Sequence, residues 1–333
     1  MRKRVSRLIG GLVLLLLFLL PSQRALMQLE ALPPPCGAFA FSTEEDFVTQ
    51  AVEPPDGITV ISDGDLLSVD PNAGGIVCAR NAELLKELDV QVDLGLDAAD
   101  VVSAEQAMVI FSTELDSPHG DQFTEGDLLA TNGAIIRNQA LTAPWQVEYD
   151  IGLDAVHMVG DPDQIMEFLA EALAVSPVDG SELFNLLETF AEVDIWYSTE
   201  GTWPQGEAIG FLDGDLLSAR SSTVLIEQQD LPDPATPAGI PSRGVDFGLD
   251  AITTDRTGEL ERVRFSSEIL YEDSVSFTDG DVIWVSNGIA WTNDAMIKPF
   301  EAMVTELGLD AIHGTLEEPS FKLYLPAVLR NFP

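Results

Sequence analysis

Four aspartates stand in an identical Gly-Leu-Asp-Ala context, and this repetition makes them the side chains of the chain best placed for chemistry. If four repeats surround one axis, the carboxylates converge and repel one another, and a hard cation such as Ca²⁺, which takes about six to eight oxygen ligands, relieves the repulsion. Alternatively, each carboxylate accepts backbone N–H hydrogen bonds in its own turn. The residues that pose this choice are Asp97, Asp154, Asp250 and Asp310.

A second acidic motif, Asp-Gly-Asp or Glu-Gly-Asp, also occurs four times, beginning at residues 63, 125, 213 and 279. Asp-Gly is foremost a turn signal. None of the four copies has the later Gly and terminal Glu that a calcium-binding EF-hand loop requires. The motif therefore predicts four turns, with a peripheral calcium site as the alternative.

Two histidines occupy the same place in the second and fourth repeats, three residues after the aspartate. They are His157 and His313. Histidine is a common ligand of transition metals, so opposite repeats of a ring could form a two-histidine site. The alternatives that we favour are coincidence or outward exposure of the two side chains.

Enzyme signatures are sparse. The chain has no GxSxG, HExxH, P-loop or nucleotide-binding fingerprint. A glycosidase needs only two carboxylates at a suitable separation, and tryptophans near strand ends could stack on sugars, although core packing explains them as well. They are Trp145, Trp203, Trp284 and Trp291.

The elements that position these residues form a repeat. Each unit has an aromatic strand ending in "FSTE", "YSTE" or "FSSE", then an acidic turn with a strand such as "GDLLS", then an apolar strand ending near an amide, and then "GLDA". The "GLDA" aspartates are spaced by 57, 96 and 60 residues. Strand-like segments between Asp-Gly or Asn-Gly turns indicate an all-β fold.

The long middle interval is explained by an insertion at residues 161–192 with helical periodicity. Pro162 after Asp161 predicts a first helix, and Ser181 is expected to cap a second one. We expect a helical hairpin that either covers a sheet edge or provides an interaction surface.

The order of the pieces predicts a closed ring. The repeats start at "FSTE" without a preceding "GLDA" and end at "GLDAIHG", so the last segment can supply the strand missing beside residues 39–44. Closure removes exposed sheet edges. A four-bladed β-propeller is the expected architecture; packed sandwiches or tandem two-repeat domains are the alternative.

The paired motifs resemble the hemopexin-type four-bladed propeller. The resemblance covers residues 39–314 and rests on the Asp-Ala dipeptides at 97, 154, 250 and 310 and on the Gly-Asp dipeptides at 64, 126, 214 and 280. In that family the Asp-Ala segments line a central channel that takes ions, which implies a channel site here. The segment "FKLYLPAVLRNFP" similarly resembles a "YLPxVLR" tail of some secreted bacterial proteins.

The N-terminus indicates export. A basic start and a thirteen-residue apolar run, Leu8–Leu20, predict a signal peptide at residues 1–25, or else an uncleaved anchor. A linker at 26–38 precedes the repeat domain at 39–314, and a tail follows at 315–333. In an oxidising compartment the two cysteines, Cys36 and Cys78, are expected to form a disulfide.

The strong negative charge of the chain limits the classes of molecule that it can bind. With 16 basic and 56 acidic residues, the formal charge is −40, which excludes binding to nucleic acid and to anionic lipid. Membrane contact is expected only through the N-terminal segment. The sequence predicts a secreted or cell-surface monomer that acts as a binding or structural module for a protein or glycan, stabilised by Ca²⁺; a secreted carbohydrate-active hydrolase or a lectin is the alternative.

Overall fold

The computed structural model describes residues 31–50, 57–70, 74–203, 210–231, 248–272, 276–285 and 288–314. The predicted signal segment and tail lie outside these ranges, as do residues 26–30 of the predicted linker. The described part is mostly β, with several small antiparallel sheets and few helices.

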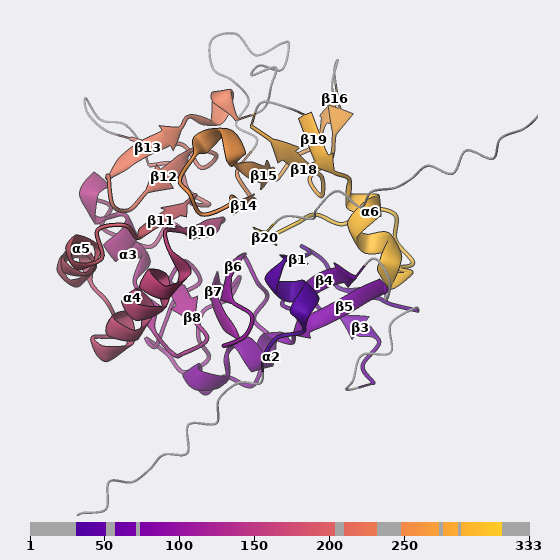
Figure 1. Cartoon of the computed structure of the whole chain (residues 1–333), viewed down its shortest axis with the longest axis horizontal. Helices are drawn as coiled ribbons and strands as arrows, with labels where there is room; N and C mark the ends of the chain where they lie inside the picture. The colour runs from indigo at the N-terminus through magenta and orange to yellow at the C-terminus, as the bar shows by residue number, and fades with distance from the viewer. Residues whose placement is uncertain are drawn as a thin grey trace, which may run out of the picture. The chain divides into compact units, whose positions relative to one another are not determined.

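Four of the sheets have four strands each and follow one plan (Figure 1). In each sheet the strand that follows a "GLDA" aspartate pairs with the aromatic strand, which pairs with the strand after the acidic turn, which pairs with the apolar strand. The sheets are β20 (Ala311–Gly314), β1 (Phe39–Ser42), β4 (Leu66–Asp70) and β5 (Gly74–Ala79); β6 (Ala98–Ser103), β7 (Met108–Ser112), β8 (Leu128–Ala130) and β9 (Ile135–Ile136); β10 (Val156–Val159), β11 (Asp194–Tyr197), β12 (Leu216–Ser218) and β13 (Thr223–Ile226); and β14 (Ala251–Thr253), β15 (Arg264–Ser266), β18 (Val282–Trp284) and β19 (Gly288–Trp291).

The first sheet joins the two ends of the repeat region. The last strand, β20, pairs antiparallel with β1, with Phe39 opposite Gly314 and Ser42 opposite Ala311. The predicted pairing of the first aromatic strand with the last "GLDA" strand is therefore confirmed. Within the described residues, the innermost strands also contact one another in a cycle, from β20 to β6, β10, β14 and back to β20.

Short elements connect these sheets. Two further two-stranded sheets are β2 (Phe47–Val48) with β3 (Val60–Ile61) and β16 (Tyr271–Glu272) with β17 (Ser276–Phe277). One-turn helices follow the fourth strand of three sheets, namely α2 (Asn81–Leu84), α3 (Asn138–Leu141) and α6 (Asn293–Ile297). The 3₁₀ turns are η1 (Pro34–Gly37), η2 (Lys86–Leu88), η3 (Ala143–Trp145), η4 (Gln228–Asp230), η5 (Leu260–Arg262) and η6 (Lys298–Phe300).

The insertion forms two helices, α4 (Pro162–Ala174) and α5 (Gly180–Thr189). Asp161 caps α4 by accepting a hydrogen bond from the Asp163 N–H. The expectation for α5 was wrong by two residues, since Asp179 rather than Ser181 caps it. The Asp179 carboxylate accepts from two backbone N–H groups, and Glu182 reaches back to the Asp179 N–H in a capping box.

The helical hairpin covers the edge of a neighbouring sheet. Between α4 and α5, the Val178 N–H donates to the Ile135 carbonyl at 2.8 Å, and the Arg137 N–H donates to the Val178 carbonyl at 3.1 Å. These bonds occupy the free edge of β9, which otherwise offers unpaired backbone groups to other chains. On the inner side, Phe168 and Leu169 of α4 are buried in the core shared by the second and third sheets.

The predicted disulfide between Cys36 and Cys78 is confirmed, with 5.9 Å between the Cα atoms. It ties η1, which lies in the segment predicted as a linker, to β5 of the first sheet. A disulfide fits an extracellular location. Among the described residues, no helix is long and apolar enough to cross a membrane.

Candidate functional site

The second aspartate of each acidic turn is a structural staple. Its two oxygens accept one backbone N–H within the turn and one at the end of the fourth strand, where the helix or 3₁₀ turn begins. In the second sheet, Asp127 accepts from Thr124 at 3.0 Å and from Asn138 at 2.8 Å. The turn interpretation of this motif is therefore confirmed. The equivalent staples are Asp65, Asp215 and Asp281.

An asparagine next to the staple positions the backbone that enters three of the four "GLDA" segments. The Asn138 amide donates to the Gly126 carbonyl at 3.2 Å and to the Gly152 carbonyl at 2.8 Å, and its oxygen accepts from the Ile151 N–H at 3.3 Å. Asn81 and Asn293 make the same type of contact. The staple and the amide together hold these three "GLDA" segments against the preceding sheet; the third sheet has Gln228 at this position, and its side-chain oxygen has no hydrogen-bond partner.

The serine of the "STE" or "SSE" motif ties three of the four sheets to the next one; the buried hydroxyl of its counterpart in the first repeat, Ser42, has no hydrogen-bond partner. Ser112 donates to the Leu153 carbonyl at 2.9 Å, and Ser198 donates to the Leu249 carbonyl at 2.6 Å. Ser266 does the same with the Leu309 carbonyl at 3.3 Å. Since these leucines belong to the following "GLDA" segments, the motif fixes neighbouring repeats against each other.

The glutamate of the "STE" or "SSE" motif lies against the glycine that begins the "GLDA" motif. A Cβ atom added at Gly308 would overlap the Glu44 carboxyl group, and one added at Gly152 would overlap that of Glu200. The same relation holds in the other two repeats, between Gly95 and Glu114 and between Gly248 and Glu268. Each repeat therefore places the carboxyl group of its glutamate against the segment that carries its aspartate.

The four "GLDA" aspartates converge. Asp154, Asp250 and Asp310 are only 5–6% exposed, whereas Asp97 is partly exposed. Burial raises the pKa of all four carboxyls well above its usual value, and neighbouring carboxylates raise it further: Asp250 and Asp97 act on Asp154, and Asp310 acts on Asp250. In all four, Oδ2 is buried without a hydrogen-bond partner.

These aspartates and the four glutamates make up a cluster that we call the acidic ring, defined as Asp97, Asp154, Asp250, Asp310, Glu44, Glu114, Glu200 and Glu268. Burial, assisted by neighbouring carboxylates, raises the pKa of Glu44 and of Glu114 to about 7. The sequence interpretation singled out the aspartates and missed the glutamates. Their fourfold repetition in "STE" and "SSE" was the available signal.

Three members of the acidic ring lie close enough to share one ion. One carboxylate oxygen each from Glu44, Asp250 and Asp310 lies within 4.8 Å of the other two, and this is the one such group found among the described residues. Oxygen ligands lie about 2.3–2.6 Å from Ca²⁺, so oxygens on one ion are separated by at most about 5 Å. The donors are all carboxylate oxygens, which suits hard cations.

The histidines do not face outward, so that expectation was wrong. Both are buried, and both approach Asp100 of β6. His313 Nδ1 lies 2.7 Å and His157 Nδ1 lies 3.3 Å from Asp100 Oδ1. Arg256 donates to both Asp100 oxygens at 2.8 Å, and the Met158 N–H donates at 2.9 Å.

We call this cluster the Asp100 hub, defined as Asp100, His157, Arg256 and His313. Burial alone would raise the pKa of Asp100, but the Arg256 guanidinium and the His157 ring hold it well below its usual range. Burial lowers the pKa of His157. Because Arg256 uses both carboxylate oxygens, the hub is an ion-pair network that links three innermost strands and the segment after β14.

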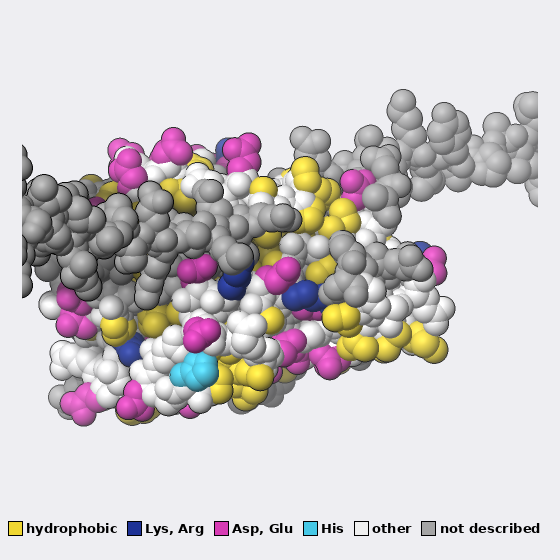
Figure 2. Space-filling view, turned by 90° about the horizontal axis from the view of Figure 1, so that it is seen from below, with side chains coloured by type: hydrophobic (Ala, Val, Ile, Leu, Met, Phe, Trp, Pro, Cys, Tyr) yellow, Lys and Arg dark blue, Asp and Glu magenta, His cyan; other side chains and the backbone are white. Residues whose placement is uncertain are grey.

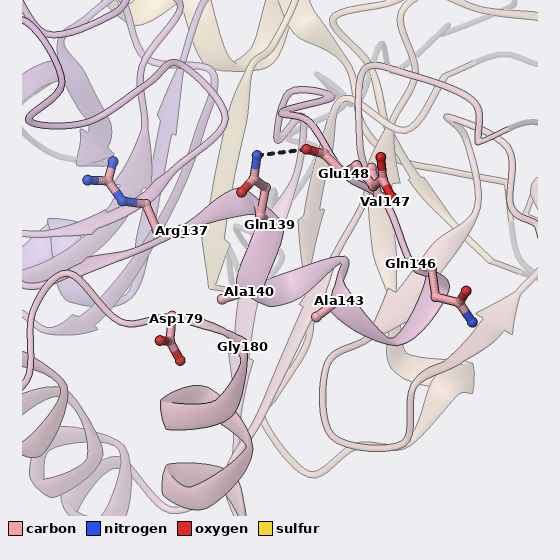
Figure 3. A pocket seen from close by; sticks show the side chains of 9 residues that line it. All are labelled: Arg137, Gln139, Ala140, Ala143, Gln146, Val147, Glu148, Asp179 and Gly180. Atoms are coloured by element: carbon pink, nitrogen blue, oxygen red, sulfur yellow. Dashed lines mark hydrogen bonds between the residues drawn. The ribbon is translucent and has the colours of Figure 1, made fainter.

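The described part of the domain also has pockets. One of about 520 Å³ is bounded by α3, η3 and the start of α5, where the Gln139 amide donates to the Glu148 carbonyl at 3.2 Å (Figure 3). A second, of about 690 Å³, lies beside Glu114 of the acidic ring. Its wall carries Asp46, Asp63 and Asp93, and its rim includes the exposed Leu115.

The tryptophans contribute mainly to packing. Trp145 is buried against Tyr197 and Phe211. Trp284 and Trp291 both lie beside the Arg264 guanidinium, 4.0 and 5.5 Å from its central carbon. On the face shown in Figure 2, acidic side chains are spread over the surface and basic ones are sparse.

Comparisons with family models, with characterised proteins and with solved structures found no match to this chain.

Proposed function

We propose that this protein is an exported four-bladed β-propeller that acts as a binding or structural module and holds a divalent cation, Ca²⁺ by preference, in its acidic ring. The observation that carries the proposal is the set of four buried aspartate oxygens without a hydrogen-bond partner. Turn-forming carboxylates have their oxygens satisfied, as the staples do. Buried carboxylates left without partners and close to one another are strongly unfavourable unless a cation compensates them.

The propeller part of the proposal is supported by the sheet plan. Four four-stranded sheets, the pairing of β1 with β20 and the cyclic contacts of the innermost strands are the arrangement that a closed four-bladed ring requires. A closed ring also places equivalent side chains of the four repeats around one axis.

Export is supported by the disulfide and by the predicted signal segment. The strong negative charge is consistent with a partner that is neutral or basic, either a protein or a glycan, and opposes binding to nucleic acid. We expect a monomer, attached to a membrane only if its N-terminal segment is retained.

The test is calcium titration of the purified protein after dialysis against EDTA. Calorimetry should detect saturable Ca²⁺ binding, and the melting temperature should rise with Ca²⁺ in the submillimolar to millimolar range typical of extracellular modules, about 10⁻⁴ to 10⁻³ M. Asp310→Asn should weaken binding, whereas Asp163→Asn, an exposed change on α4, should not.

Absence of binding heat and an unchanged melting temperature at about 10 mM Ca²⁺ would refute the cation proposal. A parallel panel of glycans tests the alternative of a carbohydrate-active hydrolase. Turnover of a glycan that is lost in Glu114→Gln and is insensitive to EDTA would favour that alternative.

A further inference from the structure

The junction where the two ends of the repeat region meet has no covalent tie among the described residues. The disulfide joins Cys36 to Cys78, which both precede the second sheet, and so it does not reach β20. The junction depends on the pairing of β1 with β20. It is supported by His313 in the Asp100 hub and by the Gly314 N–H, which donates to Thr253 Oγ1 at 2.8 Å.

The three carboxylates that lie within reach of one ion belong to this junction. Glu44 follows β1 by two residues, and Asp310 immediately precedes β20. The third, Asp250, immediately precedes β14, the innermost strand of the adjacent fourth sheet. The triad therefore joins the beginning of the repeat region, its end and the neighbouring repeat.

Unpartnered carboxylate oxygens indicate that the triad is built to hold an ion. The Oδ2 atoms of Asp250 and Asp310 are buried without partners, although both residues are more than nine-tenths buried. Gly308 provides the space that the Glu44 carboxyl group occupies, since a Cβ at residue 308 would overlap it. The φ angle of Gly308 lies outside the left-handed region, unlike those of Gly95, Gly152 and Gly248. The space for Glu44, rather than backbone conformation, is what glycine provides at position 308.

We propose that one Ca²⁺ ion binds Glu44, Asp250 and Asp310 and thereby holds the ring closed, as a latch between the first and last strands. The inference rests on the proposed cation-binding function and assigns its site and consequence. Without an ion, the three carboxylates repel one another and favour separation of β1, β14 and β20. When an ion is bound, all three carboxylates are attracted to it.

The ligand set also indicates which ions fit. Three carboxylate oxygens and no nitrogen or sulfur favour Ca²⁺ or Mg²⁺ over Zn²⁺. Ca²⁺ accepts a flexible geometry with further water ligands, whereas Mg²⁺ requires shorter distances and near-octahedral geometry. We therefore expect Ca²⁺ to bind more tightly than Mg²⁺.

Linkage gives the size of the effect. An ion that binds only the closed form lowers the opening equilibrium constant by a factor of 1 + [Ca²⁺]/Kd, about 100-fold at 100 times Kd. Hydrogen exchange of backbone amides in β1 and β20 measures this opening. Exchange between β10 and β11 of the third sheet is the internal reference, because that pair is remote in sequence from the triad.

The experiment compares the full protein with three variants in EDTA and in Ca²⁺, by calorimetry and by hydrogen exchange with mass spectrometry. Glu44→Gln removes one ligand charge. Gly308→Ala displaces the Glu44 carboxyl group while leaving the charge unchanged. Glu171→Gln is the control, because it removes one carboxylate charge at an exposed position of α4, outside the acidic ring.

We expect Glu44→Gln and Gly308→Ala each to weaken Ca²⁺ binding at least tenfold and to abolish the Ca²⁺-dependent protection of β1 and β20. Glu171→Gln should retain both. Circular dichroism verifies folding, and Gly308→Ala serves as the independent test if Glu44→Gln is misfolded.

Two results would overturn the latch while leaving the proposed function intact: unchanged Ca²⁺ affinity in both Glu44→Gln and Gly308→Ala, or Ca²⁺ protection that is equal at the junction and in the third sheet. Absence of Ca²⁺ binding to the unmodified protein would overturn both proposals.

Discussion

The Asp100 hub provides a stringent test of how the innermost strands are held together. Replacing Asp100 by Asn keeps the size of the side chain but removes its charge and turns one acceptor oxygen into a donor. The fully buried carboxylate accepts two hydrogen bonds from Arg256 at 2.8 Å and one from the Met158 N–H at 2.9 Å. His313 Nδ1 approaches it at 2.7 Å.

The expected loss follows from these contacts. The Arg256 side chain is only 12% exposed, so in Asp100→Asn its charge stays largely buried without a counter-charge. Breaking a buried ion pair by removing one partner costs about 3–5 kcal/mol. We expect about 4 kcal/mol, because both bonds from Arg256 lose a charged acceptor, and in either orientation of the new amide its N–H₂ group faces at least one of the three donors.

Urea unfolding followed by fluorescence measures the change. Arg256→Met should also destabilise, and the double variant should lose less than the sum of the two single losses by at least about 1 kcal/mol. Arg262→Gln is the matched control, because its ion pair with Asp255 is exposed and should contribute little. A loss below about 1 kcal/mol in Asp100→Asn, or additive single losses, would refute this account of the hub.

Three further predictions concern pH, the disulfide and the staples. In EDTA, the melting temperature should be higher at pH 5.5 than at pH 7.5. The carboxyls of the acidic ring have raised pKa values in the folded state, about 7 for Glu44 and Glu114, so the folded protein binds more protons than the unfolded chain. Stability is therefore lost as the pH rises through these pKa values. The lowered pKa of His157 acts in the opposite direction, because the protein loses stability below about pH 6.5, but His157 is one group against the eight carboxyls of the acidic ring. Ca²⁺ should reduce the difference in melting temperature between the two pH values. Equal melting temperatures in EDTA would contradict the prediction. Replacing both Cys36 and Cys78 by Ser should lower the free energy of unfolding by about 4 kcal/mol, from the loop entropy of a 42-residue separation, and an unchanged urea midpoint would contradict it. Asp281→Ala leaves the buried N–H of Asn293 and that of Thr278 without their acceptor and should cost about 2–4 kcal/mol in the same assay, whereas Asp294→Ala, at an exposed ion pair, should be nearly neutral; equal losses would show that the staple is dispensable.

Much of the strand order could be predicted from the sequence, because strand, turn and "GLDA" segments repeat in the same order. The pairing of residues 39–42 with residues 311–314 followed from one missing and one surplus segment at the two ends. The disulfide followed from cysteine number and compartment. These inferences depend on the order of segments along the chain, which can be read from the repeated motifs.

The chemistry of the site was less accessible, because it depends on which side chains meet across repeats. The "GLDA" aspartates were identifiable by repetition, but Glu44 was read only as the end of a strand. Its relevance follows from the close approach to Gly308, which residue types alone do not reveal. Likewise, Arg256 occurs in a single repeat, and nothing in a periodic pattern predicts that it binds Asp100.

The strand β20 has a consequence for how the protein is made. The first sheet contains β1, β4 and β5 from the beginning of the repeat region, but its fourth strand lies at residues 311–314. During synthesis, the other three sheets have all their strands before residues 311–314 are translated, while β1 still offers one unpaired edge. Such an edge can pair with other chains. It stays unpaired while most of the polypeptide is translated. A chaperone that shields β1 until translation ends, or export of the chain in an unfolded state, would protect the nascent protein from aggregation at this edge.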